Sequence, residues 1–118
     1  MSANPLENAT KAFWVYALYS TDPEIQTRRS AVRAEHMAHM GSLYEAKLIR
    51  IGGVLFEPEP KDADSPTAAG SAMVVKLGSV AEVRKILEED IYWTSNVWDK
   101  EKLLIFRIYI SSLSIDGL

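Results

Sequence analysis

The chain contains no cysteine among its 118 residues, so disulfide bridges, thiolate nucleophiles and cysteine-based metal sites are excluded. It also has no apolar run of about 18 residues, the length of a membrane-spanning helix, and no signal-peptide core near its start. Its net charge is −3, and no basic patch is long enough to follow a nucleic-acid backbone. We therefore expect a cytoplasmic protein that binds neither nucleic acid nor a membrane.

Motifs for nucleotide binding and serine hydrolysis are missing as well. There is no Gly-x-Gly-x-x-Gly, no Walker loop and no Gly-x-Ser-x-Gly elbow. The two histidines, His36 and His39, have a spacing that can chelate a metal on a helix, but no third ligand follows at a diagnostic distance. A position on the flank of the helix is the simpler interpretation of His39. We expect no metal and no cofactor.

What the chain does have is the composition of one globular domain. Its length is typical of a single domain, and 47% hydrophobic with 25% charged residues is ordinary for a soluble protein. We expect a flexible N-terminal segment over residues 1–11, a domain over 12–111 and a C-terminal tail over 112–118.

Within this domain the pattern alternates between strands and helices. Asp22 is a candidate N-cap with Pro23 at the first helical position, and Ser79 with Glu82 forms a capping box. The expected elements are a strand at 12–19, a helix at about 23–48, a strand at 49–56, a loop at 57–70, a strand at 71–77, a helix at 79–89, a connector at 90–99 and a strand at 103–110. This βαββαβ order predicts an α+β ferredoxin-like fold. The proline-rich loop is either a lid or a solvated connector.

The first and last expected strands are apolar on both faces. A sheet covered on one face by helices should instead alternate polar and apolar residues. The second face therefore meets another sheet, and the simplest supplier is a second copy of the chain. We predict a homodimer in which two sheets pack face to face, a dimeric α+β barrel.

The long helix carries the candidate chemistry. At 100° per residue, five residues lie within about 40° of one line along the helix: Arg29, Val32, His36, Met40 and Leu43. A core stripe should be entirely apolar, so a titratable ring at its centre indicates a pocket. His36 suits general acid/base work near neutral pH, and Arg29 with Arg33 could hold an anionic group. The alternative is a satisfied core histidine beside a solvated arginine rim.

Asp90, just after the second helix, could orient and charge-stabilise a histidine, or it could be a plain helix-end carboxylate. Several aromatic residues could form the walls of a site for an aromatic ligand or belong to the core: Tyr16, Tyr44, Tyr92, Trp93 and Trp98.

Four segments in order resemble the YCII-related (YciI-like) family over roughly residues 12–110. They are Arg29-x-x-x-Arg33-x-x-His36, then the segments at 48–53, 70–75 and 89–92. The resemblance implies the dimeric barrel, a pocket between sheet and helices, and an active His–Asp pair that His36 and Asp90 match. Tyr92 matches the tyrosine of the family's Asp-Pro-Tyr motif. The chain departs from the family at Ile91 and at Gly53, where the family usually has proline.

The resemblance also implies a reaction class, because family members resemble muconolactone-isomerase-like proteins and one branch removes chloride from a hydroxyquinone. We therefore expect a cofactor-independent isomerase, lyase or dehydrochlorinase acting on an anionic, aromatic or enolisable substrate. His36 and Asp90 would be catalytic, and Arg29, Arg33, Tyr92 and Tyr16 would bind the substrate. One alternative is a non-catalytic small-molecule binding or accessory protein on the same barrel; another is a subunit that only dimerises.

Overall fold

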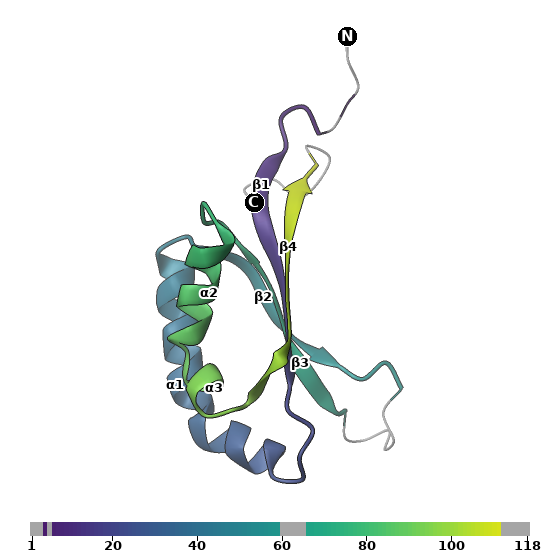
Figure 1. The fold of residues 1–118 in the computed structure, drawn as a ribbon, viewed down its shortest axis with the longest axis vertical. Helices are drawn as coiled ribbons and strands as arrows, with labels where there is room; N and C mark the ends of the chain where they lie inside the picture. The colour runs from purple at the N-terminus through teal and green to yellow at the C-terminus, as the bar shows by residue number, and fades with distance from the viewer. Residues whose placement is uncertain (1–3, 5, 60–65, 112–118) are drawn as a thin grey trace.

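The computed structural model describes residue 4, residues 6–59 and residues 66–111. These residues form, in chain order, β1 (Thr10–Tyr19), α1 (Ile25–Glu45), β2 (Ile49–Phe56), β3 (Ala68–Val75), α2 (Val80–Glu88), α3 (Ile91–Thr94) and β4 (Trp98–Ile110) (Figure 1). Within the described parts of the chain, no helix is long and apolar enough to cross a membrane.

The strands make one antiparallel sheet in the order β2-β3-β1-β4. All three helices lie on the same side of it (Figure 1). This confirms the predicted ferredoxin-like α+β fold, in which the two halves of a split βαβ arrangement place β1 and β3 at the centre.

The main core lies between the sheet and the helices. Side chains alternate across a strand, so Phe13, Val15, Ala17 and Tyr19 of β1 all face the helical layer and are buried. They pack with residues of β3, α1 and α2: Met73, Val75, Leu43, Val83 and Leu87. This single apolar layer holds α1 and α2 against the sheet.

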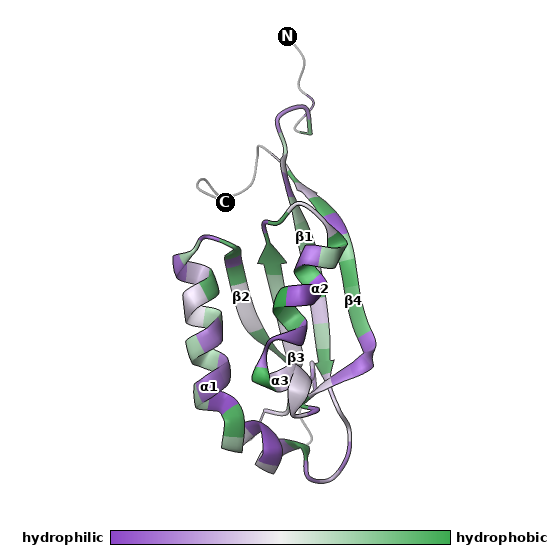
Figure 2. Ribbon diagram, turned by 60° about the vertical axis from the view of Figure 1, so that its left-hand side comes forward, coloured by the Kyte–Doolittle hydropathy of each residue, from purple (hydrophilic) through white to green (hydrophobic). Residues whose placement is uncertain are grey.

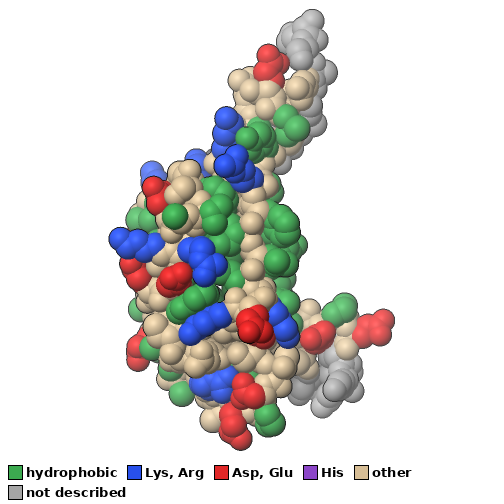
Figure 3. All heavy atoms as spheres, viewed as in Figure 1, with side chains coloured by type: hydrophobic (Ala, Val, Ile, Leu, Met, Phe, Trp, Pro, Cys, Tyr) green, Lys and Arg blue, Asp and Glu red, His purple; other side chains and the backbone are tan. Residues whose placement is uncertain are grey.

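The opposite face of the sheet is also apolar. Trp14 and Ile108 pack against a second small cluster of Ala12, Val74 and Ile110. Beside this cluster Leu104 is 48% exposed and Phe106 is 53% exposed. Hydrophobic colour runs along β4 in Figure 2, and hydrophobic side chains line the side of the sheet away from the helices in Figure 3. No described helix covers this face.

The long helix begins later than predicted, at Ile25 rather than near residue 23. Asp22 is not its N-cap: that position is Glu24, which makes no capping side-chain bond. Asp22 Oδ1 instead accepts the N–H of Glu24 at 3.1 Å, and its carboxylate pairs with Arg28 at 2.8 Å. The Asp-Pro pair thus makes a turn that precedes the helix, as Asx turns do.

The same helix ends earlier than predicted, at Glu45 rather than near residue 48. Lys47 has a left-handed backbone with φ of 63°. Its N–H donates to Tyr44 O, and the N–H of Leu48 donates to Leu43 O, which is the Schellman pattern. The sequence has no glycine at this point, so the usual mark of this helix end is absent.

The remaining predictions for caps and element boundaries are confirmed at one position and differ from the structure at others. The predicted Ser79 cap is confirmed, because Glu82 N–H donates to Ser79 Oγ. The Glu82 carboxylate accepts from Gly78 N–H, one residue before the N–H that a capping box uses. The predicted connector at 90–99 is wrong, since it holds α3 and the start of β4. Strand β1 begins at Thr10, β3 spans Ala68–Val75, and β4 begins at Trp98. Residues 60–65 of the predicted loop, and the expected tail at 112–118, lie outside the described residues.

Candidate active site

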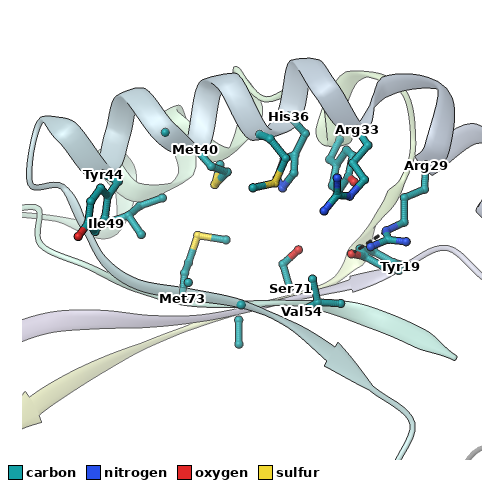
Figure 4. Close-up of a pocket in the computed structure, with 16 residues that line it drawn as sticks. Tyr19, Arg29, Arg33, His36, Met40, Tyr44, Ile49, Val54, Ser71 and Met73 are labelled. Atoms are coloured by element: carbon teal, nitrogen blue, oxygen red, sulfur yellow. Dashed lines mark hydrogen bonds between the residues drawn. The ribbon is translucent and has the colours of Figure 1, made fainter. Parts of the chain in front are cut away.

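A pocket with a volume of about 350 Å³ lies between α1 and the sheet (Figure 4). Its upper wall is α1, its floor is β2 and β3, and β1 and α3 each contribute one aromatic residue. In Figure 4 the side chains of Arg33, His36 and Met40 point from the helix toward the sheet. Of the residues of α1, only His36 and Leu43 are buried.

His36 lies at the centre of the pocket wall, held on three sides. Its ring stacks on Tyr92 with centroids 3.6 Å apart and planes 5° from parallel. Trp98 meets the ring edge-on at 5.7 Å. Nδ1 lies 2.8 Å from Asp90 Oδ1. A carboxylate only accepts, so Nδ1 carries the hydrogen and Nε2 is the nitrogen available to a ligand.

Asp90 is completely buried behind this ring. It is the N-cap of α3 in extended backbone, with its Oδ1 accepting the N–H of Tyr92 at 2.8 Å. Ile91 occupies the first helical position, where proline is common, and the cap forms without it. The backbone of this short helix therefore aims the carboxylate at α1.

A third donor reaches the same carboxylate. His39, one turn after His36, places Nδ1 at 2.7 Å from Asp90 Oδ2. Burial by itself would raise the pKa of Asp90, but the hydrogen bonds from His36, His39 and the Tyr92 N–H outweigh it and lower that pKa below its ordinary value. Asp90 is therefore ionised at neutral pH.

The histidine pair is arranged around Asp90 rather than around a shared ion. Both Nδ1 atoms point at the carboxylate oxygens. Across the described residues there is no group of three or more histidine, aspartate and glutamate side chains that could hold a metal.

One end of the pocket is cationic. Arg29 and Arg33 line it, and Arg29 Nε donates to Tyr19 Oη at 3.1 Å (dashed in Figure 4). Burial, with a smaller effect from Tyr19, raises the pKa of Tyr92, so this phenol stays neutral and can donate a hydrogen bond. Because Arg29 and Arg33 both line this end, an anionic group bound there would meet two guanidinium groups.

The other end is apolar. Met40 and Met73 face each other across the pocket, with Ile49 and Tyr44 beyond them (Figure 4). Gly53 forms part of the floor, and a Cβ there would meet nothing within 4 Å. The register of β2 against β3 shifts between Ile49 and Ile51, just before this floor. The pocket thus runs from charge to hydrocarbon, with His36 between the two ends.

The structure brings together five of the six site residues predicted from the sequence. Arg29, Arg33, His36 and Tyr92 line the pocket, and Asp90 supports His36 from behind. Tyr16 does not line the pocket. It packs edge-on against Trp14, at 5.7 Å between centroids, on the opposite face of the sheet.

Sequence reasoning placed Met40 on the pocket side of the helix but missed Tyr19, Met73 and the contact of His39 with Asp90. Strand alternation could have found Tyr19, because it shares a face with Phe13 and Val15, which are buried under the helices. Nothing in the sequence shows that Asp90 reaches His39.

Three comparisons with known proteins fit this fold. The family model of the YCII-related domain matches residues 13–107. A solved structure of 5-chloro-2-hydroxyhydroquinone dehydrochlorinase from Burkholderia phenoliruptrix, in complex with 2,5-dihydroxybenzoquinone, superimposes with a TM-score of 0.66. It is 21% identical and covers 82% of this chain and 92% of its own. At that identity the likeness shows a shared fold.

Two fungal proteins are similar in sequence. Aspartate kinase FUB3 of Fusarium oxysporum is 24% identical over 91 residues, which are 77% of this chain but 17% of that protein. Fusaric acid biosynthesis protein 2 of Gibberella fujikuroi is 24% identical over 84 residues, 71% of this chain and 81% of that protein. The chain thus corresponds to a small part of the first relative and to most of the second.

Proposed function

This chain belongs to the YCII-related domain family, and we propose that it is a small-molecule enzyme of the isomerase, lyase or dehydrochlorinase type. It would use His36 and Asp90 as an acid/base pair on an anionic substrate that is aromatic or enolisable. The observation that carries the proposal is the 2.8 Å contact between His36 Nδ1 and the buried Asp90 carboxylate, which leaves Nε2 for the pocket.

The geometry supports a proton transfer at Nε2. His36 takes a proton from a hydroxyl or from a C–H beside a carbonyl, and the bonding electrons stay on the substrate as a phenolate or enolate. Asp90 stabilises the imidazolium that forms. The proton then returns to a different atom in an isomerisation. In an elimination a leaving group departs with its bonding pair, and the imidazolium later gives its proton to water.

The two ends of the pocket support one orientation of the substrate. Its anionic group would bind Arg29 and Arg33, and its hydrocarbon part would lie against Met40 and Met73. The reacting atom then lies opposite His36, midway between the ends. The pocket volume of about 350 Å³ suits a molecule of one ring with a short substituent.

The relatives support a small organic substrate. The solved neighbour is named for removing chloride from a chlorinated hydroxyhydroquinone and was solved with a dihydroxybenzoquinone, while one fungal relative is named for the biosynthesis of fusaric acid. A hydroxyquinone is both enolisable and anionic, so 2,5-dihydroxybenzoquinone is a suitable first probe for this pocket.

The test measures binding of 2,5-dihydroxybenzoquinone by calorimetry and turnover of a panel of hydroxyquinones and enolisable acids, including chloride release from 5-chloro-2-hydroxyhydroquinone. For any substrate that turns over, His36→Gln should lower kcat by roughly 10²–10⁴-fold, the usual contribution of a positioned acid or base. Arg84→Gln, on α2 away from this pocket, is the control. Full activity of His36→Gln would overturn the mechanism.

The alternative function is non-catalytic binding. The match to 17% of an aspartate kinase indicates that a domain of this kind can occur as part of a larger protein. In that case the pocket would bind an anionic ligand through the arginines, with His36 only donating or accepting a hydrogen bond. Tight binding across the panel with no turnover would favour this alternative.

We also propose that the sheet face away from the helices joins a second copy of the chain, which would make the dimeric α+β barrel. Leu104 and Phe106 are about half exposed there. Among the described residues, no acceptor reaches the buried Nε1 of Trp14 on the same face. Burying a large apolar side chain stabilises by roughly 1.5–3 kcal/mol, and a partner could also supply the missing acceptor.

Sedimentation velocity tests the dimer. The wild type should sediment at twice the mass of the 13.2 kDa chain, and Phe106→Glu should sediment as a folded monomer. Val80→Glu is the matched control, since Val80 is similarly exposed but lies on α2. A stable monomeric wild type would exclude the barrel.

A further inference from the structure

The carboxylate that supports His36 has a second imidazole on its other oxygen. Asp90 Oδ1 accepts from His36, and Asp90 Oδ2 accepts from His39 at 2.7 Å. The His39 side chain is 24% exposed, whereas that of Asp90 is 0% exposed. His39 does not line the pocket. It therefore lies between the buried carboxylate and solvent, on the side away from the substrate.

We propose that His39 is a positioning residue, which holds the second oxygen of Asp90 and, through its own charge, sets how strongly that carboxylate supports a proton on His36. The inference rests on the proposed function for its catalytic meaning, but the arrangement of His39, Asp90 and His36 can be tested without a substrate.

The positioning part follows from the hydrogen bonds. A carboxylate with one oxygen unpaired in a buried site can rotate or take up a proton, and either change would weaken its bond to His36. With Oδ1 held by His36 and the Tyr92 N–H and Oδ2 held by His39, both oxygens have fixed partners. The ring of His36 is then held in one tautomer with Nε2 toward the pocket.

The charge part follows from the donors. The Nδ1 of His39 donates in both the neutral and the protonated ring, so its proton arrives and leaves at Nε2 without breaking the bond to Asp90. A cationic His39 offsets the negative charge that would otherwise stabilise a cationic His36. Protonation of either ring therefore disfavours protonation of the other.

The other charged groups near this unit are the same in the wild type and in a His39 variant. The titratable or charged groups that line the pocket beside His36 are Arg29 and Arg33 on α1, Tyr19 on β1 and Tyr92 on α3, and Glu35 lies one helical turn before His39 on α1. None of them contacts the Asp90 carboxylate through a side chain. Changing His39 alone thus isolates its effect on Asp90.

The chain has two histidines, so NMR of the imidazole carbons and nitrogens in untagged protein gives one set of signals for each ring. The wild type should show both His36 and His39 signals responding in two steps over a pH titration. In His39→Asn, whose amide can still donate from the Nδ1 position, His36 should titrate in a single step and keep its Nδ1–H tautomer. In His39→Leu the donor is lost, and His36 should show mixed tautomers.

Single, independent titrations of the two histidines in the wild type would overturn the charge coupling. A His36 tautomer unchanged in His39→Leu would overturn the positioning role. If His39→Leu fails to fold, the wild type and His39→Asn still decide the coupling, and His39→Ala, which also lacks a donor, replaces it for the tautomer. These outcomes do not depend on turnover, so the proposed enzyme activity can fail while this arrangement stands, or the reverse.

For a substrate that turns over, His39→Leu should lower kcat about tenfold with KM little changed, because the substrate does not touch His39. His39→Asn should restore most of kcat. It should also reduce the acid limb of the kcat/KM pH profile from two ionisations to one. A higher KM with an unchanged kcat in His39→Leu would instead indicate that His39 contacts the substrate. That result would refute the role of His39 behind Asp90.

Discussion

Replacing Asp90 with alanine should be the most destabilising single change in the site. The carboxylate is fully buried and accepts from the Tyr92 N–H, from His36 and from His39. Without it, the N–H of Tyr92 and the Nδ1–H of His36 stay buried without an acceptor, at about 1–3 kcal/mol each. His39 is partly exposed and can turn to water. We expect a loss of about 3–5 kcal/mol in the free energy of unfolding at neutral pH.

Asp90→Asn is the matched milder change. Its carbonyl oxygen can still accept from Tyr92 and His36, while its NH₂ group faces His39, which must then present a lone pair. We expect a loss of about 1–2 kcal/mol. Urea denaturation followed by tryptophan fluorescence measures both variants at one fixed protein concentration, because association with a second copy would otherwise shift the result.

The pH dependence provides the stricter check. The pKa of Asp90 in the folded protein is lowered from its ordinary value of 3.8. Its contribution is therefore fully present above that value and is lost as the pH falls through the lower folded pKa. The gap between wild type and Asp90→Ala should be present at neutral pH and shrink as the pH falls below 3.8. A gap below about 1 kcal/mol at pH 7, or one unchanged in acid, would refute this account of the buried carboxylate.

Three further changes test the pocket and the fold. Arg29→Gln should raise KM for an anionic substrate by about tenfold or more while changing kcat less, and an unchanged KM in steady-state kinetics would remove Arg29 from the binding end. Gly70→Ala should cost roughly 1–3 kcal/mol in urea denaturation, because its Cβ would lie 2.7 Å from Ala17 O. Gly53→Ala, with nothing within 4 Å, is the control, and equal losses would contradict the close approach. Ser79→Ala should cost about 0.5–2 kcal/mol through the lost cap of α2, and no change in the urea midpoint would show that this cap is unimportant.

Local patterns in the sequence were enough for the order of the four strands and the two longer helices, although they missed α3. The apolar run at 12–19 and the Ser79 capping box predicted β1 and α2, because a buried strand and a helix start each depend on neighbouring residues. Element ends were less predictable where a side chain or an unusual backbone decides them. Asp22 makes a turn with Arg28 in place of a cap, and Lys47 ends α1 in a conformation usually left to glycine.

The residues of the site were also predictable from the sequence only in part. Helical periodicity placed Arg29 and His36 on the inner side of α1, since residues three and four apart share a face, and the resemblance to a family suggested Asp90. Tyr16 was predicted to bind the substrate, but it lies on the face of the sheet away from the pocket. Tyr19 is the tyrosine that contacts Arg29.

The sequence by itself therefore determined the fold class and the helix face that bears His36, because both follow from short-range periodicity. Only the tertiary structure decided that Asp90 lies between two histidines, that Tyr92 and Trp98 enclose the His36 ring, and that the pocket runs from arginine to methionine. Those contacts join residues more than fifty positions apart, and their distances depend on how the sheet, α1 and α3 pack together.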